Sequence, residues 1–271
     1  MRAPLFLISF ALSSAACSGT ADDSGQGAAS QDESAAAAEG AGDAAVPAED
    51  YAEEEETERY VFEYSWPAAV AAEAGLVEVL GDRAQGMKAE VAARADEDWE
   101  AAGEGDWTPR QHSLSEEWKV VADLQRYLSL SGHLATYSGG AHGMYGLRSL
   151  VWDREAKQAM KGIALFNSPV ALEQGLGQRL CDTLNAERAK RRGSPVEPGS
   201  GNTFDDCPGL DEASVLLGSS NGKTFDRLSV YFGPYVAGPY AEGDYELDFP
   251  VTASVLDAVK PHYADAFSVK R

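Results

Sequence analysis

The chain has 271 residues and a formal net charge of −22, from 44 Asp and Glu against 22 Lys and Arg. This charge argues against a nucleic-acid partner, because binding to phosphate backbones depends on clustered Lys and Arg. A basic protein, a cation or a neutral glycan is a more compatible partner, and the alternative is that the acidity serves solubility alone.

The first residues have the pattern of an export signal. An apolar run over Leu5–Leu12 is too short to span a bilayer, and small residues lead from it to Cys17. The run Leu12-Ser-Ser-Ala-Ala-Cys17 resembles a bacterial lipobox, which implies cleavage after residue 16 and acylation of Cys17. Ser18 is, by the same resemblance, typical of the outer membrane, so we expect a lipid-anchored protein that faces the periplasm. The alternative is an ordinary signal peptide with an unmodified cysteine.

An acidic segment follows the signal. Ser18–Glu58 contains 13 acidic residues, no Lys or Arg, and much Ala, Gly and Ser. Such a segment buries too little apolar surface to offset the entropy of ordering, so we expect a disordered tether in which Glu53–Glu56 is solvated. The alternative is that this acidic run contacts cations or basic proteins. The predicted division is therefore a signal peptide over 1–16, a lipidated cysteine with its tether over 17–58, and one domain over 59–271.

The first half of the domain, 59–166, is expected to contain a strand, a helical region and then a meander of strands. Apolar spacings near three and four predict one long helix over Ala71–Ala102, or two short helices broken near Gly81–Gly86. Alternation and branched or aromatic residues predict strands at Tyr60–Trp66, Leu114–Asp123, Tyr127–Tyr137, Tyr145–Trp152 and Gln158–Ile163.

The second half, 167–271, begins with the clearest helix signal. Ser168-Pro169 is a cap and first-turn pair, and periodic Leu residues follow until Gly193 ends the pattern after a basic cluster. The helix dipole favours cations near the C-terminus of a helix, so the basic cluster needs no ligand to explain it. Strands are predicted at Arg227–Phe232 and Tyr245–Phe249, and a short helix at Val251–Val259. Because strands and helices form separate runs, we predict an α+β fold: an antiparallel sheet with two main helices packed on it and a short C-terminal helix.

Two cysteines remain after Cys17. Cys181 lies in the predicted helix and Cys207 follows the next loop. An even pair outside the cytoplasm is most simply a disulfide, which would tie the loop to the helix. A metal site or a catalytic thiol is the competing interpretation, and it lacks a nearby histidine in the sequence.

Two motifs carry a resemblance to a known family. The first is Tyr137-Ser-Gly-Gly-Ala-His-Gly143 with Asp153 and Phe166 after it; the second combines Phe232-Gly-Pro-Tyr235, Gly238-Pro-Tyr-Ala-Glu-Gly243 and Phe249-Pro250. Together they resemble extracytoplasmic domains of the PdaC peptidoglycan deacetylase, where the domain precedes the catalytic one, and of the RsiV lysozyme-sensing anti-sigma factor. The turn Glu155-Ala-Lys157 departs from the family, which usually has a glycine there. The resemblance implies an α+β domain that binds lysozyme in one branch.

The candidate binding residues follow from these motifs. Glycines beside His142 are expected to allow positive φ or close backbone approach in a tight turn, with His142 bonded to that turn or contacting a ligand. Exposed tyrosines near the second motif could stack on sugars or anchor a protein, or else fill the core. The candidate set is His142, Gly139, Gly140, Tyr235 and Tyr240, from a wider cluster that includes Tyr231 and Tyr245.

A catalytic constellation does not assemble in the sequence. Thr203-Phe-Asp-Asp206 copies the first motif of polysaccharide deacetylases, but only His262 follows it where a histidine pair is needed. We therefore expect a non-catalytic envelope module without cofactor, which binds a basic protein such as lysozyme or a cell-wall glycan. A peptidoglycan or polysaccharide deacetylase or hydrolase is the alternative.

Overall fold

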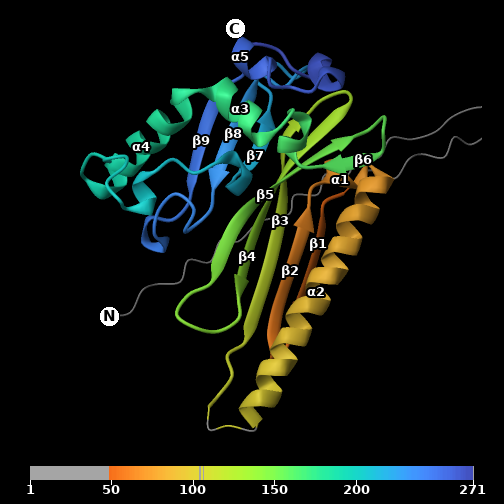
Figure 1. The fold of residues 1–271 in the computed structure, drawn as a ribbon. Helices are drawn as coiled ribbons and strands as arrows, with labels where there is room; N and C mark the ends of the chain where they lie inside the picture. The colour runs from red at the N-terminus through yellow and green to blue at the C-terminus, as the bar shows by residue number, and fades with distance from the viewer. Residues whose placement is uncertain (1–48, 104, 106, 271) are drawn as a thin grey trace, which may run out of the picture. The chain divides into compact units, whose positions relative to one another are not determined.

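The computed structural model describes residues 49–103, 105 and 107–270, and the fold is α+β as predicted. It contains two sheets instead of the single antiparallel sheet expected (Figure 1). Neighbouring strands are antiparallel except β2 and β3, which run parallel because a long helix connects them. The six-stranded sheet consists of β1 (Tyr51–Glu56), β2 (Tyr60–Trp66), β3 (His112–Asp123), β4 (Tyr127–Tyr137), β5 (Met144–Asp153) and β6 (Gln158–Met160). The three-stranded sheet consists of β7 (Ser214–Gly218), β8 (Arg227–Phe232) and β9 (Tyr245–Pro250).

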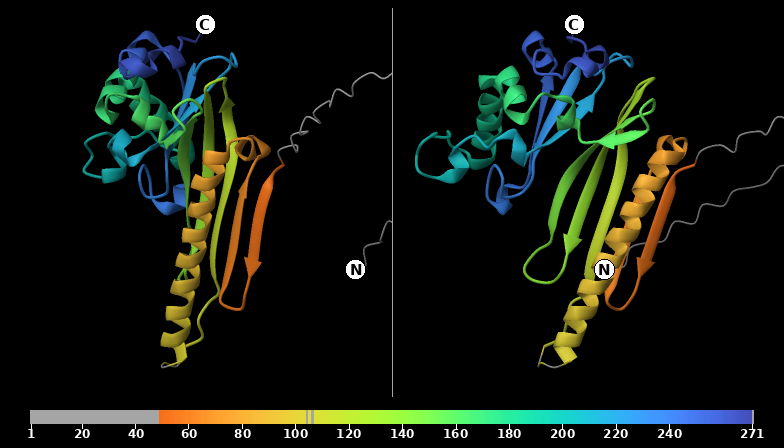
Figure 2. Two further views of the ribbon diagram at one scale, coloured as in Figure 1. Left: turned by 90° about the vertical axis from the view of Figure 1, so that its right-hand side faces the viewer. Right: turned by 45° about the vertical axis from the view of Figure 1, so that its right-hand side comes forward.

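The helices lie against different sheets. In Figures 1 and 2, α2 runs along the six-stranded sheet, while α3 and α4 lie beside the three-stranded sheet. The α-helices are α1 (Ala68–Ala71), α2 (Ala74–Gly103), α3 (Pro169–Leu176), α4 (Gln178–Arg192) and α5 (Ala253–Leu256). Short 3₁₀ helices are η1 (Gly162–Leu165), η2 (Thr203–Asp205), η3 (Leu210–Glu212), η4 (Tyr240–Glu242) and η5 (Pro261–Ala266). The terminal α-helix is thus shorter than predicted.

Helix α2 is continuous, so of the two predicted arrangements the single long helix is the observed one. Gly81 and Gly86 do not break it, and no other group comes within 4 Å of the place where their side chains would begin. One face is buried at spacings of three and four, through Leu76, Leu80, Ala84, Met87, Val91 and Ala95. This face packs on the sheet, against residues that include Phe62, Tyr64, Leu128 and Trp152.

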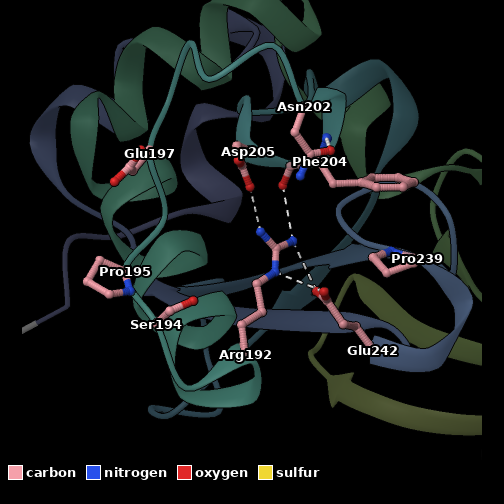
Figure 3. Close-up of a pocket in the computed structure, with 9 residues that line it drawn as sticks. All are labelled: Arg192, Ser194, Pro195, Glu197, Asn202, Phe204, Asp205, Pro239 and Glu242. Atoms are coloured by element: carbon pink, nitrogen blue, oxygen red, sulfur yellow. Dashed lines mark hydrogen bonds and ion pairs between the residues drawn. The ribbon is translucent and has the colours of Figure 1, made fainter.

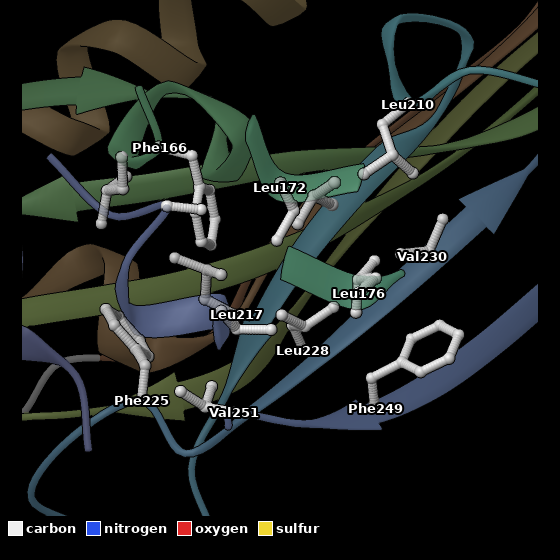
Figure 4. Packing of buried hydrophobic residues seen from close by; sticks show 14 of the residues in the cluster. Phe166, Leu172, Leu176, Leu210, Leu217, Phe225, Leu228, Val230, Phe249 and Val251 are labelled. Carbon is white, nitrogen blue, oxygen red and sulfur yellow. The ribbon is translucent and has the colours of Figure 1, made fainter. Parts of the chain in front are cut away.

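The second core lies between the three-stranded sheet and the helices that cover it (Figure 4). It includes Phe166, Leu172, Leu176, Leu210, Leu217, Phe225, Leu228, Val230, Phe249 and Val251. The predicted helix over 168–193 is interrupted, because Gly177 has a φ of 60° and separates α3 from α4. Its predicted cap is confirmed, since the Ser168 hydroxyl accepts a hydrogen bond from the Ala171 amide at 3.0 Å.

The prediction of a disordered tether is wrong for its last part. Tyr51–Glu56 forms β1 and pairs antiparallel with β2. The Tyr51 ring stacks on Trp66 with centroids 3.9 Å apart, and Glu53 and Glu55 both pair with Lys88 of α2, Glu53 at 2.9 Å. Alternate acids therefore face a cation instead of repelling one another.

The predicted signal peptide, Cys17 and the tether up to residue 48 lie outside the described residues. Within 49–103, 105 and 107–270, every helix is too short or too polar to cross a membrane.

A strand that the sequence did not predict, β7, joins the two sheets. It packs against β3, β4 and β5, and the Ser214 hydroxyl donates to the Leu147 carbonyl at 2.5 Å. Beside this contact, the amide of Gly162 donates to the Ser149 hydroxyl at 3.0 Å. A Cβ atom on Gly162 would lie 2.1 Å from the Val215 carbonyl oxygen, so no other residue fits there.

The predicted disulfide is present. Cys181 of α4 and Cys207 are bonded, with 26 residues of separation and Cα atoms 5.7 Å apart. Closing a loop of this length stabilises the folded state by about 3.5 kcal/mol in the chain-entropy account. The bond ties the loop after α4 back to the helix.

The turn between β5 and β6 stores backbone strain at Lys157. Lys157 has a φ of 52°, while Asp153 accepts from the amides of Glu155 and Ala156 at 2.9 and 3.1 Å. We predict that Lys157→Gly raises the free energy of unfolding by about 0.5–1 kcal/mol, because glycine adopts positive φ without a steric penalty. Urea denaturation measures this.

The matched control is Lys157→Ala, which also removes the exposed ion pair with Glu73 but keeps the Cβ atom. It should not gain stability. A glycine variant no more stable than the alanine variant would contradict the prediction.

Candidate functional site

Five aromatic side chains form a continuous, partly exposed row, which we call the aromatic strip: His133, Tyr145, Tyr240, His142 and Tyr235. His142 stacks on Tyr240 with ring centroids 3.8 Å apart and planes at 18°. Tyr235 lies 5.6 Å from Tyr240, Tyr145 lies 6.2 Å from Tyr240, and His133 stacks on Tyr145 at 6.3 Å. Tyr235 is half exposed, so the strip ends in an accessible ring.

The turn between β4 and β5 positions His142 as the sequence suggested. Gly139 and Gly140 have φ values of 90° and 88°, which glycine adopts without strain. The His142 Nδ1–H donates to the Gly143 carbonyl at 2.9 Å, which leaves Nε2 to accept from the Tyr235 hydroxyl at 3.4 Å. The Tyr240 hydroxyl donates to the same Gly143 carbonyl at 2.9 Å. The imidazole is therefore held from both sides.

Arginines at the end of α4 hold the other side of the strip. Arg188 is fully buried and donates to the carbonyl of Ala237 at 2.8 Å. Arg191 donates to the carbonyls of Glu242 and Asp244, each at 2.5 Å, and lies over the Tyr245 ring at 4.0 Å. The basic cluster thus organises the loop between β8 and β9, which carries Tyr235 and Tyr240.

Arg192 closes the base of a neighbouring pocket of 370 Å³ (Figure 3). Its Nη1 lies 2.7 Å from Asp205, and its Nε donates to Glu242 at 2.8 Å. Burial of Glu242 opposes ionisation, but hydrogen bonds from Arg192 and the Tyr245 hydroxyl outweigh it, so the pKa of Glu242 is lowered. Two carboxylates therefore share one guanidinium here.

The deacetylase-like motif occupies this same pocket wall. Asp205 accepts from the Ser200 hydroxyl at 2.6 Å as well as binding Arg192, and hydrogen bonding from Ser200 lowers the pKa of Asp205. Asp206 accepts from the Gly199 amide at 3.1 Å. Both carboxylates have structural partners. Among the described residues, no three His, Cys, Asp or Glu side chains gather as metal ligands.

Part of the six-stranded sheet and helix α2 match a known family model. Residues 53–145 match the family model described as "Deacetylase PdaC". The matched range begins inside β1 and ends at Tyr145, so it includes the His142 turn and excludes Tyr235 and Tyr240.

Solved structures of DUF3298 family proteins are also similar to the chain. A member from Bacteroides fragilis is 17% identical, with a TM-score of 0.40, and the alignment covers 74% of this chain and 90% of that one. A DUF3298 family protein from Pseudomonas aeruginosa is 16% identical, with a TM-score of 0.44, covering 82% and 96%. No curated protein matches.

The structure brings together most, but not all, of the residues proposed from the sequence. His142, Tyr235 and Tyr240 are in contact, and Gly139 and Gly140 shape the turn between β4 and β5. Tyr231 and Tyr245 are instead buried, which was the alternative considered for them.

Sequence reasoning missed Tyr145 and His133. Strand pairing aligns Tyr145 with Ala135, two residues from His133 and on the same face. Hairpin register was the only sequence signal available for this contact.

Glu242 is expected to make stability depend on pH. Because its folded-state pKa is lowered, its contribution is complete above the unfolded pKa and is lost as the pH falls through the folded value. We predict that Glu242→Gln lowers the free energy of unfolding at pH ~7 by about 2 kcal/mol through lost charge-assisted hydrogen bonds. The deficit should shrink as the pH falls below about 4. Urea denaturation across pH measures it; a deficit that is constant down to pH ~3 would contradict the account.

Proposed function

We propose that this protein is a non-catalytic binding module of the cell envelope and that the aromatic strip contacts its partner. The observation that carries the proposal is the exposed Tyr235 ring beside the stacked Tyr240 and His142 pair. Tyrosine is enriched at binding hot spots because its ring is large, rigid and amphipathic. Hydrogen bonds to Gly143 and the arginine contacts fix these rings before binding, which reduces the entropy lost on association.

A basic protein fits this surface best. The net charge of −22 favours a cationic partner. Two acidic residues, Asp244 and Glu246, come shortly after Tyr240 in the sequence. Asp244 also accepts from the Tyr145 hydroxyl at 3.4 Å. Lysozyme is a basic protein, and one branch of the extracytoplasmic domains that the sequence resembles binds it. It is therefore the first partner to test. Cell-wall glycan, which stacks on aromatic rings, is the second.

The non-catalytic assignment is part of the proposal. Its support is that Asp205 and Asp206, the residues of the deacetylase-like motif, are engaged by Arg192, Ser200 and Gly199. The resemblance noted in the sequence also implies that this type of domain stands apart from the catalytic domain of the deacetylase.

Membrane attachment through Cys17 is proposed from the lipobox alone. In this arrangement residues 18–50 separate the lipid from the first strand, β1. The strip would then be presented in the periplasm at a distance set by this acidic segment.

The test is binding of purified lysozyme, measured by titration calorimetry at physiological and at high ionic strength. We predict saturable binding that weakens with salt, and about a tenfold loss of affinity for Tyr235→Ala, the size typical of a hot-spot residue. Trp107→Ala is the matched control, because Trp107 is equally exposed but lies outside the strip.

Purified peptidoglycan is tested in parallel. Binding of peptidoglycan but not lysozyme, with the same loss in Tyr235→Ala, would assign the strip to a glycan. Equal affinities for the wild type and Tyr235→Ala would contradict the role of the strip. Release of acetate or muropeptides, abolished by Asp205→Asn, would contradict the non-catalytic assignment.

A further inference from the structure

A second cavity, away from the aromatic strip, combines apolar walls with positive charge. It has a volume of 480 Å³ and lies where α2, the β5–β6 hairpin and β7 meet. Val79, Leu150 and Ile163 contribute apolar wall, and the charged residues lining it are Arg83, Arg148 and Lys161. None of its lining residues carries a carboxylate, in a chain whose net charge is −22.

One buried carboxylate serves two of these cations. The Glu116 side chain is fully buried and receives Arg83 through Nε at 2.6 Å and Nη2 at 2.9 Å. Arg148 reaches the other side of the same carboxylate, with its Nε 3.1 Å from Oε1. Two guanidinium groups thus share one negative charge.

The cleft therefore has positive charge without a full counter-charge. Among the described residues, Lys161 forms no ion pair within 4.0 Å. Burial and repulsion from Arg83 lower the pKa of Arg148, which is the expected result of crowding two cations. An additional anion would relieve this repulsion.

The shape and chemistry of the cleft define what it accepts. Its volume is in the range of small-molecule sites, which pair apolar walls with a few polar anchors. Guanidinium groups bind carboxylates in a bidentate manner, and Val79 exposes 40% of its surface at the apolar wall. We propose that this cleft binds a small amphiphile with one anionic head group and an apolar body, of the fatty-acid class.

The orientation of the ligand follows from the lining. The head group lies at Lys161 and at Arg148, which retains donors after its contact with Glu116 is made. The apolar body packs along Val79 of α2, Leu150 of β5 and Ile163 of η1. This site is independent of the proposed binding function of the aromatic strip.

The probe is dodecanoate, titrated into the full chain in detergent-free buffer and followed by calorimetry. Acetate tests the head group alone, and dodecyltrimethylammonium tests the same tail with the opposite charge. We predict saturable binding of one dodecanoate, with at least about a tenfold preference over either comparison compound.

Arg148→Gln should weaken dodecanoate binding by about tenfold through loss of a charge-assisted contact. Its fold should persist, because Glu116 keeps Arg83 as partner. Val79→Asp is the second variant and places a negative charge at an exposed part of the wall; it should also weaken binding. Lys223→Gln, in an exposed loop outside the cleft, is the matched control and should bind like the wild type. Circular dichroism checks that each variant is folded.

Three results would overturn the proposal. The first is equal binding of dodecanoate and dodecyltrimethylammonium, which would indicate apolar contact alone. The second is acetate binding as tightly as dodecanoate, which would indicate an anion site without a role for the walls. The third is unchanged dodecanoate affinity in folded Arg148→Gln and Val79→Asp.

Discussion

The close approach of η1 and β7 at Gly162 is the constraint on which the rest of this structure depends. The backbone of Gly162 lies so near the Val215 carbonyl that no side chain can stand between them. Ser149 and Ser214 bridge the same junction by hydrogen bonds. The three-stranded sheet is thereby fixed against β5, and the loop between β8 and β9 meets the turn between β4 and β5. The cleft proposed to bind an amphiphile borders this junction, because Ser149, Ser214 and Val215 line it.

Three groups of positively charged residues have different roles in this acidic protein. The arginines at the end of α4 donate hydrogen bonds to backbone carbonyls and to Glu242 and Asp205. They thereby organise the loop that carries Tyr235 and Tyr240. Lys88 similarly fixes the acidic strand β1. The cations around Glu116 differ, because they outnumber their buried counter-charge. A structural role accounts for the first two groups, and the third forms part of the cleft that we propose binds an anionic amphiphile.

Periodicity predicted most strands and the long helix, because each buries one regular face. It did not predict β1, since the partner of its glutamates is Lys88, distant in sequence, nor β7, a strand of only five residues. Nothing in the Leu spacing of the second half signalled the break at Gly177. For the site, motifs identified His142, Tyr235 and Tyr240 separately. Their meeting depends on how the sheets pack, and Tyr145 and His133 join them only through strand register.

The stack of His142 on Tyr240 is the contact that best reports this packing. The two residues are 98 positions apart in the chain, and they lie in loops that belong to different sheets. Nuclear Overhauser spectroscopy on protein with labelled histidine and tyrosine measures it directly. With ring centroids 3.8 Å apart, strong cross-peaks are expected between the imidazole protons of His142 and the ring protons of Tyr240. Assigned resonances without these cross-peaks would mean that the two loops do not meet, and the strip would not exist.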